Sequence, residues 1–491
     1  MSHLLSKSSF LKGIQCDKQL YLYKYYYDRM DPVSSIQQAV FDRGTSVGLL
    51  AQSLFPGGTT GTEDPRKSSV AAEKTKSLMD NNTKVIYEAA FEYDDILIIS
   101  DIIVRDGKKW SVYEVKSSTS ISETYILDAA VQYYVLNNCG LNIKDISIVY
   151  INNQYVRNGD LDIRSLFNIE SVKELVLEQQ GLILSETKRL KEVLKQKTIP
   201  DIPIGVQCFN PYQCSFFGTC WKDVPGYSVF NIANLGIEKK FDLYNNGYVR
   251  LEDIPDDYKL NANQRMQIDT HKSNKVVIDK AALKKFLSEI TYPLYFMDFE
   301  TFMPAVPMFD NSKPYQQIPF QYSLHYMKKE DAELEHYEFL ADASGDPRAA
   351  FIKKLLKDTK GKGKILVYNK SFEITRLKEI ARDFPEFEDE INERINRIVD
   401  LMLPFQKKYY YSPEMKGSYS IKYVLPALVP EMSYDELEIK EGGTASLAFE
   451  SLYYENDLFK MQDTRENLLK YCRMDTLAMV KIINKIKRII T

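Results

Sequence analysis

The 491-residue sequence lacks any uninterrupted apolar stretch long enough to cross a bilayer, which takes about 20 residues. It also lacks a strong charge of either sign, because 64 Lys and Arg stand against 68 Asp and Glu, a formal net charge of −4. That balance argues against tight non-specific coating of nucleic acid, although it is compatible with a local basic groove. No internal repeat or low-complexity tract appears in the sequence. We therefore expect a globular protein that does not span a membrane.

Cysteine and histidine are both scarce, with six Cys and four His in the chain. The first six residues, 1–6, have no apolar core region of the kind that a signal peptide needs. We therefore expect a cytoplasmic protein whose thiols stay free rather than forming disulfides. The length, with a 44% share of hydrophobic residues, is typical of a protein with two or three domains.

Acidic residues follow apolar runs at two places in the C-terminal half. Asp298 and Glu300 come after the run at residues 295–297, and Glu373 comes shortly after the run at residues 365–368. The predicted strands are 295–299 and 365–368, and Glu373 is predicted to lie on the helix that follows the second one. This alternation of strands and helices is typical of a mixed α/β sheet.

A third acidic position lies near the C-terminus. The stretch 467–487 is helix-like and carries Tyr471 and Asp475, which share one face because residues four apart lie one turn from each other. Mg²⁺ and Mn²⁺ prefer hard oxygen ligands, and two ions about 4 Å apart stabilise both the attacking and the leaving oxygen of a phosphodiester displacement. The three acidic clusters together therefore predict a metal-dependent nuclease.

The order and spacing of these residues resemble the tyrosine subclass of the DEDD, DnaQ-like, exonuclease superfamily. That superfamily carries Asp-x-Glu on its first strand, an Asp at the start of a later helix and a closing Tyr-x3-Asp, on an RNase H-like mixed sheet. The metal ligands that the resemblance implies are Asp298, Glu300, Glu373 and Asp475. Tyr471 would orient the attacking water or help to deprotonate it. Glu373 stands where the superfamily has Asp, and Asp400 either supports the site or merely ends a strand.

A second acidic pattern lies in the N-terminal half. An apolar strand broken by Asp101 is followed by a turn and by an alternating strand that carries Glu114 and Lys116 on one face. A hairpin would bring Asp101 beside them. Two unpaired carboxylates need a cation, and Lys116 could hold or activate a water nucleophile. A helix predicted to begin at Asp128 would let Gln132 reach the metal-bound water or a phosphate.

This pattern resembles the PD-(D/E)XK nuclease fold in its RecB-like branch, which implies Asp101 and Glu114 as metal ligands beside Lys116 and Gln132 at a catalytic site. Some members of the branch join their ends with an iron-sulfur cluster, held by one Cys before the nuclease core and three after it. The residues with that layout here are Cys16, Cys208, Cys214 and Cys220. The resemblance therefore implies a 4Fe–4S cluster, with zinc as the alternative.

Other residues depart from this branch or fall outside its pattern. Relatives place a metal-binding His where Gly48 stands here, and Glu88 could substitute for it as a ligand. Cys139 and Cys472 lie outside the four-cysteine layout and are predicted to be packing residues.

The motifs predict three parts, a RecB-like module at 1–224, a helical connector at 225–291 and a DEDD-type module at 292–491. The whole chain resembles an uncharacterised bacterial family that fuses two such nuclease modules. The resemblance implies a cytoplasmic, Mg²⁺- or Mn²⁺-dependent exonuclease, in repair or in defence against mobile elements. Its partner would be nucleic acid, with DNA favoured over RNA.

Two other interpretations stay open. In the first, only the C-terminal module cuts, and the N-terminal module binds nucleic-acid ends with a degenerate site. In the second, the protein is a noncatalytic nucleic-acid-binding scaffold or redox sensor built on the iron-sulfur module. The departures at Glu373 and Gly48 favour the second interpretation, because each changes an expected ligand.

Overall fold

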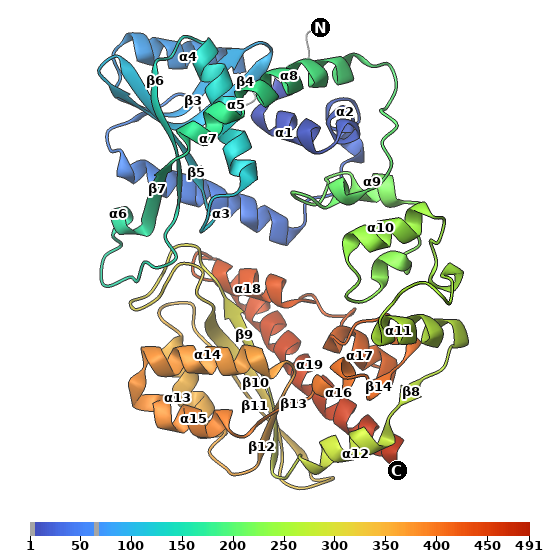
Figure 1. Cartoon of the computed structure of the whole chain (residues 1–491). Coiled ribbons are helices and arrows are strands. Elements are labelled where there is room, and N and C mark those ends of the chain that lie inside the picture. The colour runs from blue at the N-terminus through green and yellow to red at the C-terminus, as the bar shows by residue number, and fades with distance from the viewer. Residues whose placement is uncertain (1–4, 63–67) are drawn as a thin grey trace. The chain divides into compact units, whose positions relative to one another are not determined.

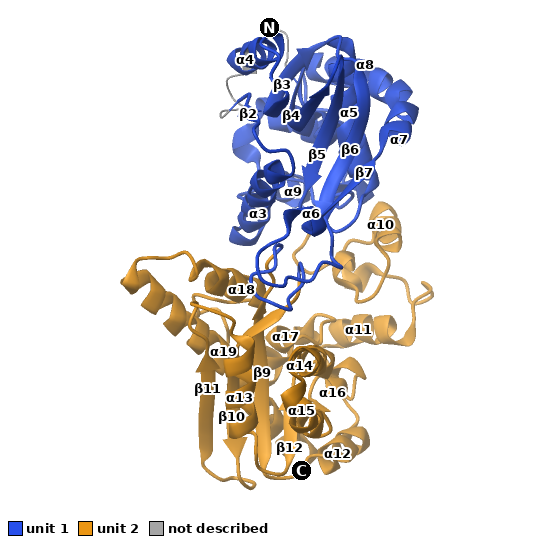
Figure 2. Ribbon diagram, turned by 90° about the vertical axis from the view of Figure 1, so that its left-hand side faces the viewer, with its two compact units in different colours: residues 1–223, 305–315 blue, residues 224–304, 316–491 orange. Residues whose placement is uncertain are grey.

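The computed structural model describes residues 5–62 and 68–491 (Figure 1). The chain divides into two compact units, one of Met1–Asp223 with Ala305–Tyr315 and one of Val224–Pro304 with Gln316–Thr491 (Figure 2). The predicted boundary at residue 224 falls beside the boundary between the units, and the predicted connector belongs to the second unit. Residues 1–4, part of the stretch inspected for a signal peptide, lie outside the described residues.

The first unit is built on one mixed sheet, in which seven strands of the described residues take part. Six of them follow the order β2-β3-β4-β5-β6-β7, and β1 pairs in parallel with β4. Strands β3, β4 and β5 are antiparallel neighbours, whereas β5 and β6 are parallel and are joined through α5. The strand bounds are Leu5–Ser6 (β1), Thr59–Thr60 (β2), Val85–Tyr93 (β3), Ile96–Asp106 (β4), Lys109–Lys116 (β5), Ile143–Ile151 (β6) and Phe167–Ser171 (β7).

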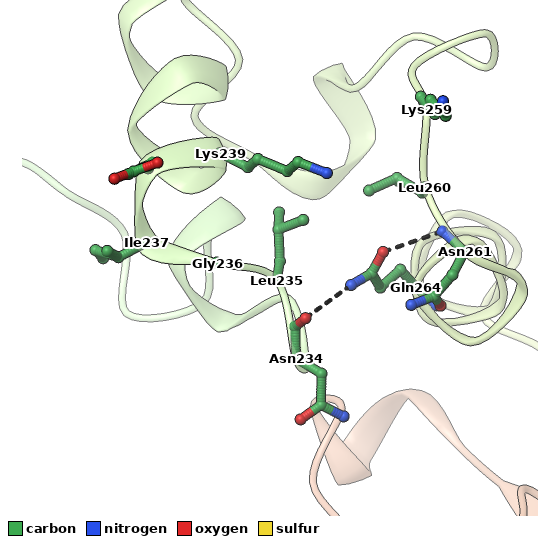
Figure 3. Close-up of a pocket in the computed structure, with 10 residues that line it drawn as sticks. Asn234, Leu235, Gly236, Ile237, Lys239, Lys259, Leu260, Asn261 and Gln264 are labelled. Carbon is green, nitrogen blue, oxygen red and sulfur yellow. Dashed lines mark hydrogen bonds between the residues drawn. The ribbon is translucent and has the colours of Figure 1, made fainter.

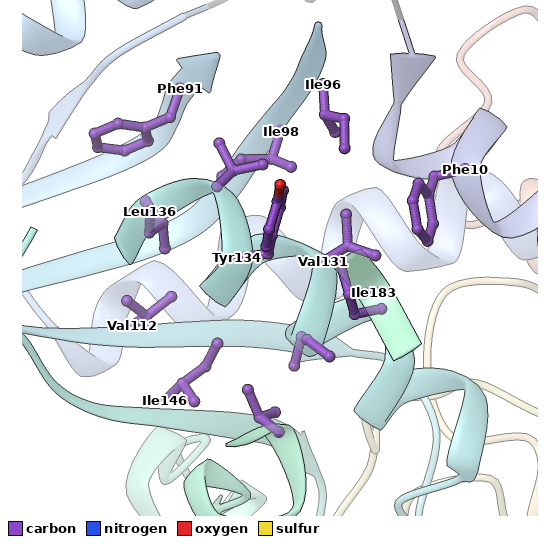
Figure 4. Close-up of a cluster of buried hydrophobic side chains, with 14 of the residues drawn as sticks. Phe10, Phe91, Ile96, Ile98, Val112, Val131, Tyr134, Leu136, Ile146 and Ile183 are labelled. Atoms are coloured by element: carbon purple, nitrogen blue, oxygen red, sulfur yellow. The ribbon is translucent and has the colours of Figure 1, made fainter. Parts of the chain in front are cut away.

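Helices cover both faces of this sheet. Helices α1, α5 and α8 enclose the main core, in which Phe10, Val131 and Ile183 meet strand residues such as Ile98 and Ile146 (Figure 4). The C-terminal end of α3 packs with strand residues of a second buried cluster. The helix bounds are Lys7–Gln15 (α1), Asp17–Tyr25 (α2), Ser35–Ala51 (α3), Ser68–Asp80 (α4), Glu123–Asn138 (α5), Ile163–Leu166 (α6), Lys173–Glu178 (α7), Gln180–Lys195 (α8) and Phe217–Trp221 (α9).

The predicted start of α5 at Asp128 is wrong, since the helix begins at Glu123. Ser122 adopts the extended backbone of an N-cap, and Glu123 brings a negative charge to the first turn. Asp128 and Gln132 therefore lie in the middle of the helix, one turn apart, and both are buried.

The second unit contains a five-stranded sheet of order β11-β10-β9-β12-β13 within the described residues. Strands β9, β10 and β11 are antiparallel, and β12 runs parallel to both β9 and β13. A separate strand pair joins β8 to β14. The strand bounds are Val277–Ile278 (β8), Leu294–Phe302 (β9), Ile318–Met327 (β10), Leu334–Leu340 (β11), Lys364–Val367 (β12), Ile398–Asp400 (β13) and Tyr410–Tyr411 (β14).

Helices also sandwich the second sheet. Helices α13, α14 and α15 pack on one face, and α18 and α19 pack on the other (Figure 2). The helix bounds are Ile237–Asn245 (α10), Ala262–Ser273 (α11), Lys280–Ser288 (α12), Arg348–Asp358 (α13), Lys370–Asp383 (α14), Glu388–Ile395 (α15), Leu403–Gln406 (α16), Ile421–Leu428 (α17), Gly442–Ser451 (α18) and Leu458–Ile490 (α19).

The expectation of a mixed α/β protein with more than one domain is confirmed. The segment predicted as a helical connector holds α10, α11 and α12 together with the short strand β8. Strand β9 runs from Leu294 to Phe302, beyond the predicted strand 295–299, so Asp298 and Glu300 both lie within it. Among the described residues, no helix combines the length and the apolar character needed to cross a membrane.

Candidate active site

Five predicted site residues line one cavity of the second unit, which has a volume of about 180 Å³. Strand β9 contributes two carboxylates, α14 contributes one, and α19 contributes a carboxylate and a tyrosine. They are Asp298, Glu300, Glu373, Asp475 and Tyr471. Alternate residues of a strand face opposite ways, so the odd-numbered residues of β9 enter the core below α13 and α14 while the even-numbered ones face α19. The helical spacing of four then places Tyr471 beside Asp475.

Burial raises the pKa of the carboxyl groups in this cavity. Glu300, Glu373 and Asp475 are buried, and Asp298 is half-buried. Burial raises the pKa of Asp298, Glu300 and Glu373 well above the ordinary range, and repulsion from neighbouring carboxylates adds to the rise. Burial also raises the pKa of Asp475, to about 6, against the hydrogen bond from Tyr434 and the charge of Lys422. A cation placed among these groups would remove the cost of ionising them.

The residues present fit such a cation. Glu373 Oε2 is buried and accepts no hydrogen bond from any described residue. Oxygen atoms of Asp298 and Glu300 lie within 4.8 Å of each other and of the Cys472 sulfur. Carboxylate oxygens without donors are the ligands that Mg²⁺ and Mn²⁺ prefer. The donor set therefore suits a hard divalent cation, with one thiol at its edge.

Cys472, predicted as a packing residue, is indeed buried but also faces this site. Its sulfur lies 3.9 Å from Asp298 Oδ2 and 3.8 Å from the Asp298 carbonyl oxygen. Burial and the charge of Asp298 raise the pKa of the thiol well above its usual range. The sulfur is thus a neutral neighbour of the acidic cluster.

Two further residues were missed in the sequence: Lys422, which lines the cavity, and Tyr434, which contacts one of its carboxylates. The Tyr434 hydroxyl group donates a 2.6 Å hydrogen bond to Asp475 Oδ1, and Lys422 Nζ lies 5.8 Å from the Tyr471 ring centroid. Burial and the charge of Asp475 raise the pKa of Tyr471 well above its usual range. Tyr471 is therefore a neutral phenol, suited to orienting a water molecule rather than to removing its proton. Lys422 lies in the first turn of the amphipathic helix α17, which was the one signal in the sequence, whereas a loop tyrosine such as Tyr434 carries none.

Asp400 both ends a strand and supports the site, the two roles that the sequence left open. It ends β13, and its carboxylate accepts hydrogen bonds from the backbone N–H groups of Asn369 at 3.1 Å, Lys370 at 3.3 Å and Met402 at 3.0 Å. Asn369, which precedes α14, has a left-handed backbone with a φ of 80°. Asp400 thereby fixes the start of the helix that carries Glu373 and does not itself line the cavity.

The four predicted residues of the N-terminal site also come together. Glu114 Oε1 accepts a 2.7 Å hydrogen bond from Lys116, and Glu114 Oε2 accepts a 2.5 Å bond from the Gln132 amide. Asp101 Oδ2 accepts a 2.6 Å bond from the Val115 backbone N–H. Gln132 was predicted to reach water or phosphate, but its amide is here shared between Glu114 and the Ser100 hydroxyl group.

Two residues that the sequence did not reveal change the charge of this site. Lys7 Nζ lies 2.7 Å from Glu114 Oε1 and 3.4 Å from Asp128 Oδ1, and Lys116 also pairs with Asp128. Burial opposes ionisation of Glu114, but Lys116 and Lys7 outweigh it and hold its pKa well below the ordinary range. Burial and the charge of Glu114 raise the pKa of Asp101 to about 8. Both oxygens of Glu114 already accept hydrogen bonds from side chains, so this donor set fits a divalent cation less well than the C-terminal one.

Gly48 and its possible substitute Glu88 have different surroundings. Gly48 lies on α3 and has open space where a side chain would begin. Glu88 lies between the β3 residues that pair with Ile102 and Ser100 of β4 and has a φ of 49°, and burial and the charge of Glu114 raise its pKa. Glu88 is therefore a fourth acidic residue at the N-terminal site, beside Asp101, Glu114 and Asp128.

The four predicted cluster cysteines line one hollow in the first unit. They are Cys16, Cys208, Cys214 and Cys220. Burial raises the pKa of Cys214 to about 12, and the other thiols add to the rise. Buried thiols that lie this close together are costly to ionise. They fit a metal group bound by thiolates, because its positive charge offsets that cost. Cys139, predicted as a packing residue, is exposed at the end of α5, so that prediction is wrong.

A larger cavity, of about 780 Å³, lies between α10 and α11 in the second unit (Figure 3). The Gln264 side chain spans it by donating to the Asn234 carbonyl oxygen at 3.1 Å and accepting from the Asn261 backbone N–H at 3.1 Å. Lys239 and Lys259 border it. None of the predicted site residues lines this cavity.

Comparison with known proteins gives relatives without an assigned activity. Residues 295–420 match a family described as a domain of unknown function, DUF2779, a span that includes Asp298, Glu300, Glu373 and Asp400 but ends before Tyr471. The chain is 29% identical over 257 residues to the uncharacterised protein UU173 of Ureaplasma parvum, which covers 47% of this chain and 36% of that protein. It is 28% identical over 216 residues to the homologue of uncharacterised protein MG366 in Mycoplasma pneumoniae, which covers 40% and 32%. The matches thus span about a third of the length of these relatives, to which the chain is similar in part.

Proposed function

We propose that this protein is a metal-dependent nuclease whose catalytic centre is the four-carboxylate cavity of the second unit. The observation that carries the proposal is the meeting of four carboxylates from β9, α14 and α19 in one cavity, with the buried Glu373 Oε2 free of hydrogen bonds to described residues. Such an arrangement is costly for an empty protein interior and is favourable around divalent cations.

The residues of the cavity divide the work of phosphodiester hydrolysis. Mg²⁺ or Mn²⁺ held by Asp298, Glu300, Glu373 and Asp475 would stabilise the attacking and leaving oxygens. The neutral Tyr471 hydroxyl group holds the attacking water in line, and Tyr434 fixes Asp475 through its 2.6 Å hydrogen bond. Lys422 supplies the positive charge that draws a phosphate toward the cavity.

The order of these residues along the chain supports a DEDD-type, RNase H-like identity for the second unit and exonucleolytic action on nucleic acid. DNA is the favoured substrate, in repair or in defence against mobile elements. The same kind of resemblance supports a PD-(D/E)XK, RecB-like identity for the first unit, with Asp101, Glu114, Lys116 and Gln132 at its site.

The charge of the N-terminal site favours a binding role for the first unit. Lys7 and Lys116 already neutralise Glu114 and Asp128, so the unit needs no divalent cation to offset these two carboxylates. We infer that the second unit cuts and that the first unit holds nucleic-acid ends. Cys16, Cys208, Cys214 and Cys220 would hold a 4Fe–4S cluster that fixes the loops of the first unit, and zinc is the alternative occupant.

The test is a hydrolysis assay on DNA and RNA labelled at either end, with Mg²⁺ or Mn²⁺ and protein purified without oxygen. Asp298→Asn is expected to abolish cleavage, whereas Glu114→Gln is expected to leave the rate of cleavage of saturating substrate unchanged. Loss of cleavage in Glu114→Gln alone would move the catalytic centre to the first unit. If the wild-type protein cuts none of these substrates, the protein is instead a noncatalytic scaffold or redox sensor.

A further inference from the structure

A tyrosine stands out on the loop that joins two of the cluster cysteines. Tyr212, between Cys208 and Cys214, is 57% exposed. The loop is fixed to the end of α1, because the Gln15 side-chain amide donates hydrogen bonds of 2.7 Å to the carbonyl oxygens of Gln207 and Tyr212. An aromatic side chain is thus held in solvent on a backbone that is itself restrained.

Tyr212 belongs to a group of aromatic side chains beside the N-terminal site. Burial and the neighbouring Tyr125 side chain on α5 raise the pKa of Tyr212, and Lys116 Nζ lies 5.2 Å from the centroid of the Tyr125 ring. Tyr315 comes from another segment of the same unit, and its hydroxyl group donates to the Ser117 carbonyl oxygen just beyond β5. The Arg43 guanidinium group lies 5.8 Å from the Tyr315 ring centroid.

We propose that Tyr125, Tyr212 and Tyr315, with Arg43 and Lys116, form a binding site for unpaired nucleotides at the N-terminal acidic cluster. This inference rests on the proposed function only in taking nucleic acid as the ligand. Every base has a flat face that stacks on a tyrosine ring whatever its sequence, while the Arg43 guanidinium group attracts the phosphates and Lys116, which is paired with Glu114 and Asp128, contacts the Tyr125 ring. A duplex keeps its bases stacked on each other, so the site prefers a single strand or a frayed end.

Simple packing does not explain the exposed member of the group. A tyrosine that serves the core buries its ring, as Tyr134 does in the first unit, whereas more than half of Tyr212 faces solvent. Because Tyr212 lies on the short loop between Cys208 and Cys214, its position depends on the group that these cysteines bind. Loss of the cysteine-bound group is therefore expected to weaken single-strand binding as well.

The experiment measures binding of a fluorescent single-stranded oligonucleotide and of its duplex to the full chain by anisotropy in EDTA, where no cleavage occurs. Tyr212→Ala is expected to weaken single-strand binding about 5- to 160-fold, which is the loss of one base–aromatic stack converted to affinity, and to change duplex binding less. Tyr212→Phe is expected to retain binding. Tyr27→Ala is the matched control, because Tyr27 is 58% exposed on the same unit and lies outside this aromatic group.

Equal single-strand affinities for Tyr212→Ala and Tyr27→Ala would overturn the inference, as would equal losses for the single strand and the duplex. Thermal unfolding of each variant separates loss of the site from loss of the fold. The outcome is independent of the proposed catalytic centre, since Asp298→Asn is expected to bind the single strand normally while cutting nothing. A protein that cuts in Mn²⁺ but whose Tyr212→Ala variant binds as wild type would keep the nuclease and remove this site.

Discussion

Replacing Asp475 by Asn is expected to make the metal-free protein more stable at alkaline pH. Burial raises the pKa of Asp475 from the ordinary 3.8 to about 6. Because one pKa unit corresponds to about 1.36 kcal/mol, the ionised carboxylate costs the folded state up to about 3 kcal/mol near pH 8. Asn keeps the shape of the side chain, and its carbonyl oxygen can accept the hydrogen bond that Tyr434 donates to Asp475.

The direction of the pH dependence follows from the raised pKa. The folded state binds the Asp475 proton more tightly than the unfolded chain, so this contribution to stability is complete below about pH 4 and is lost as the pH rises through about 6. The Asn variant has no such loss. The difference in free energy of unfolding between the two proteins is therefore expected to be small near pH 4 and largest above about pH 7.

Urea unfolding in EDTA over this pH range measures the effect, with Asp463→Asn as the control. Asp463 is an exposed residue of the same helix, and its substitution is expected to change stability by no more than about 0.5 kcal/mol. Added Mn²⁺ is expected to reverse the order, because binding stabilises the folded wild type while the variant lacks a ligand. The reasoning fails if Asp475→Asn is the less stable protein in EDTA near pH 8, or if Mn²⁺ stabilises both equally.

Three other predictions follow from the charges and contacts of the sites. Lys7→Met is expected to bind one Mn²⁺ ion more than the wild type, as counted by electron paramagnetic resonance. The double variant Lys7→Met with Glu114→Gln is expected to lose that extra ion. An unchanged count in Lys7→Met would show that Lys7 does not stand in for a cation. Tyr471→Phe is expected to lower kcat by about 100-fold with little change in KM, since it removes the hydroxyl group that orients water. Tyr434→Phe is expected to weaken Mn²⁺ binding instead. An unchanged kcat in Tyr471→Phe would contradict the role of Tyr471 in orienting water. Protein purified without oxygen is expected to absorb broadly near ~400 nm, and Cys214→Ser is expected to lose that band; a colourless protein holding one zinc ion per chain would contradict the iron-sulfur assignment.

Local periodicity was enough to predict the main parts of the C-terminal site. The strand alternation that places Asp298 and Glu300 on one face, and the helical spacing of Tyr471 and Asp475, are both properties of short segments. The bounds were less predictable, because β9 continues to Phe302 by pairing with β10, a contact between distant parts of the chain.

Lys116 was predicted from the alternation of its strand, whereas Lys7 and Lys422 were beyond sequence reasoning, since tertiary packing alone places them at the two sites. Lys7 pairs with Glu114 across 107 positions of the chain, and no motif marks it. Lys422 and Tyr434 reach Asp475 from a segment between the second and third acidic motifs. A sequence thus showed which residues are acidic without showing which positive charge neutralises them.

That distinction separates the two sites physically. In the N-terminal site, the ammonium groups of Lys7 and Lys116 bond directly to Glu114. In the C-terminal site, Lys422 makes no such bond among the described contacts, and a buried oxygen of Glu373 has no donor. A protein interior that gathers carboxylates without donors is the kind of site that draws a divalent cation from solution.

The most direct measurement is anomalous diffraction at the manganese edge from crystals of the full chain grown with Mn²⁺. The account predicts anomalous density among Asp298, Glu300, Glu373 and Asp475, and no such density at Glu114. Density at Glu114 alone, with the four-carboxylate cavity empty, would contradict the assignment of the catalytic metal centre to the second unit.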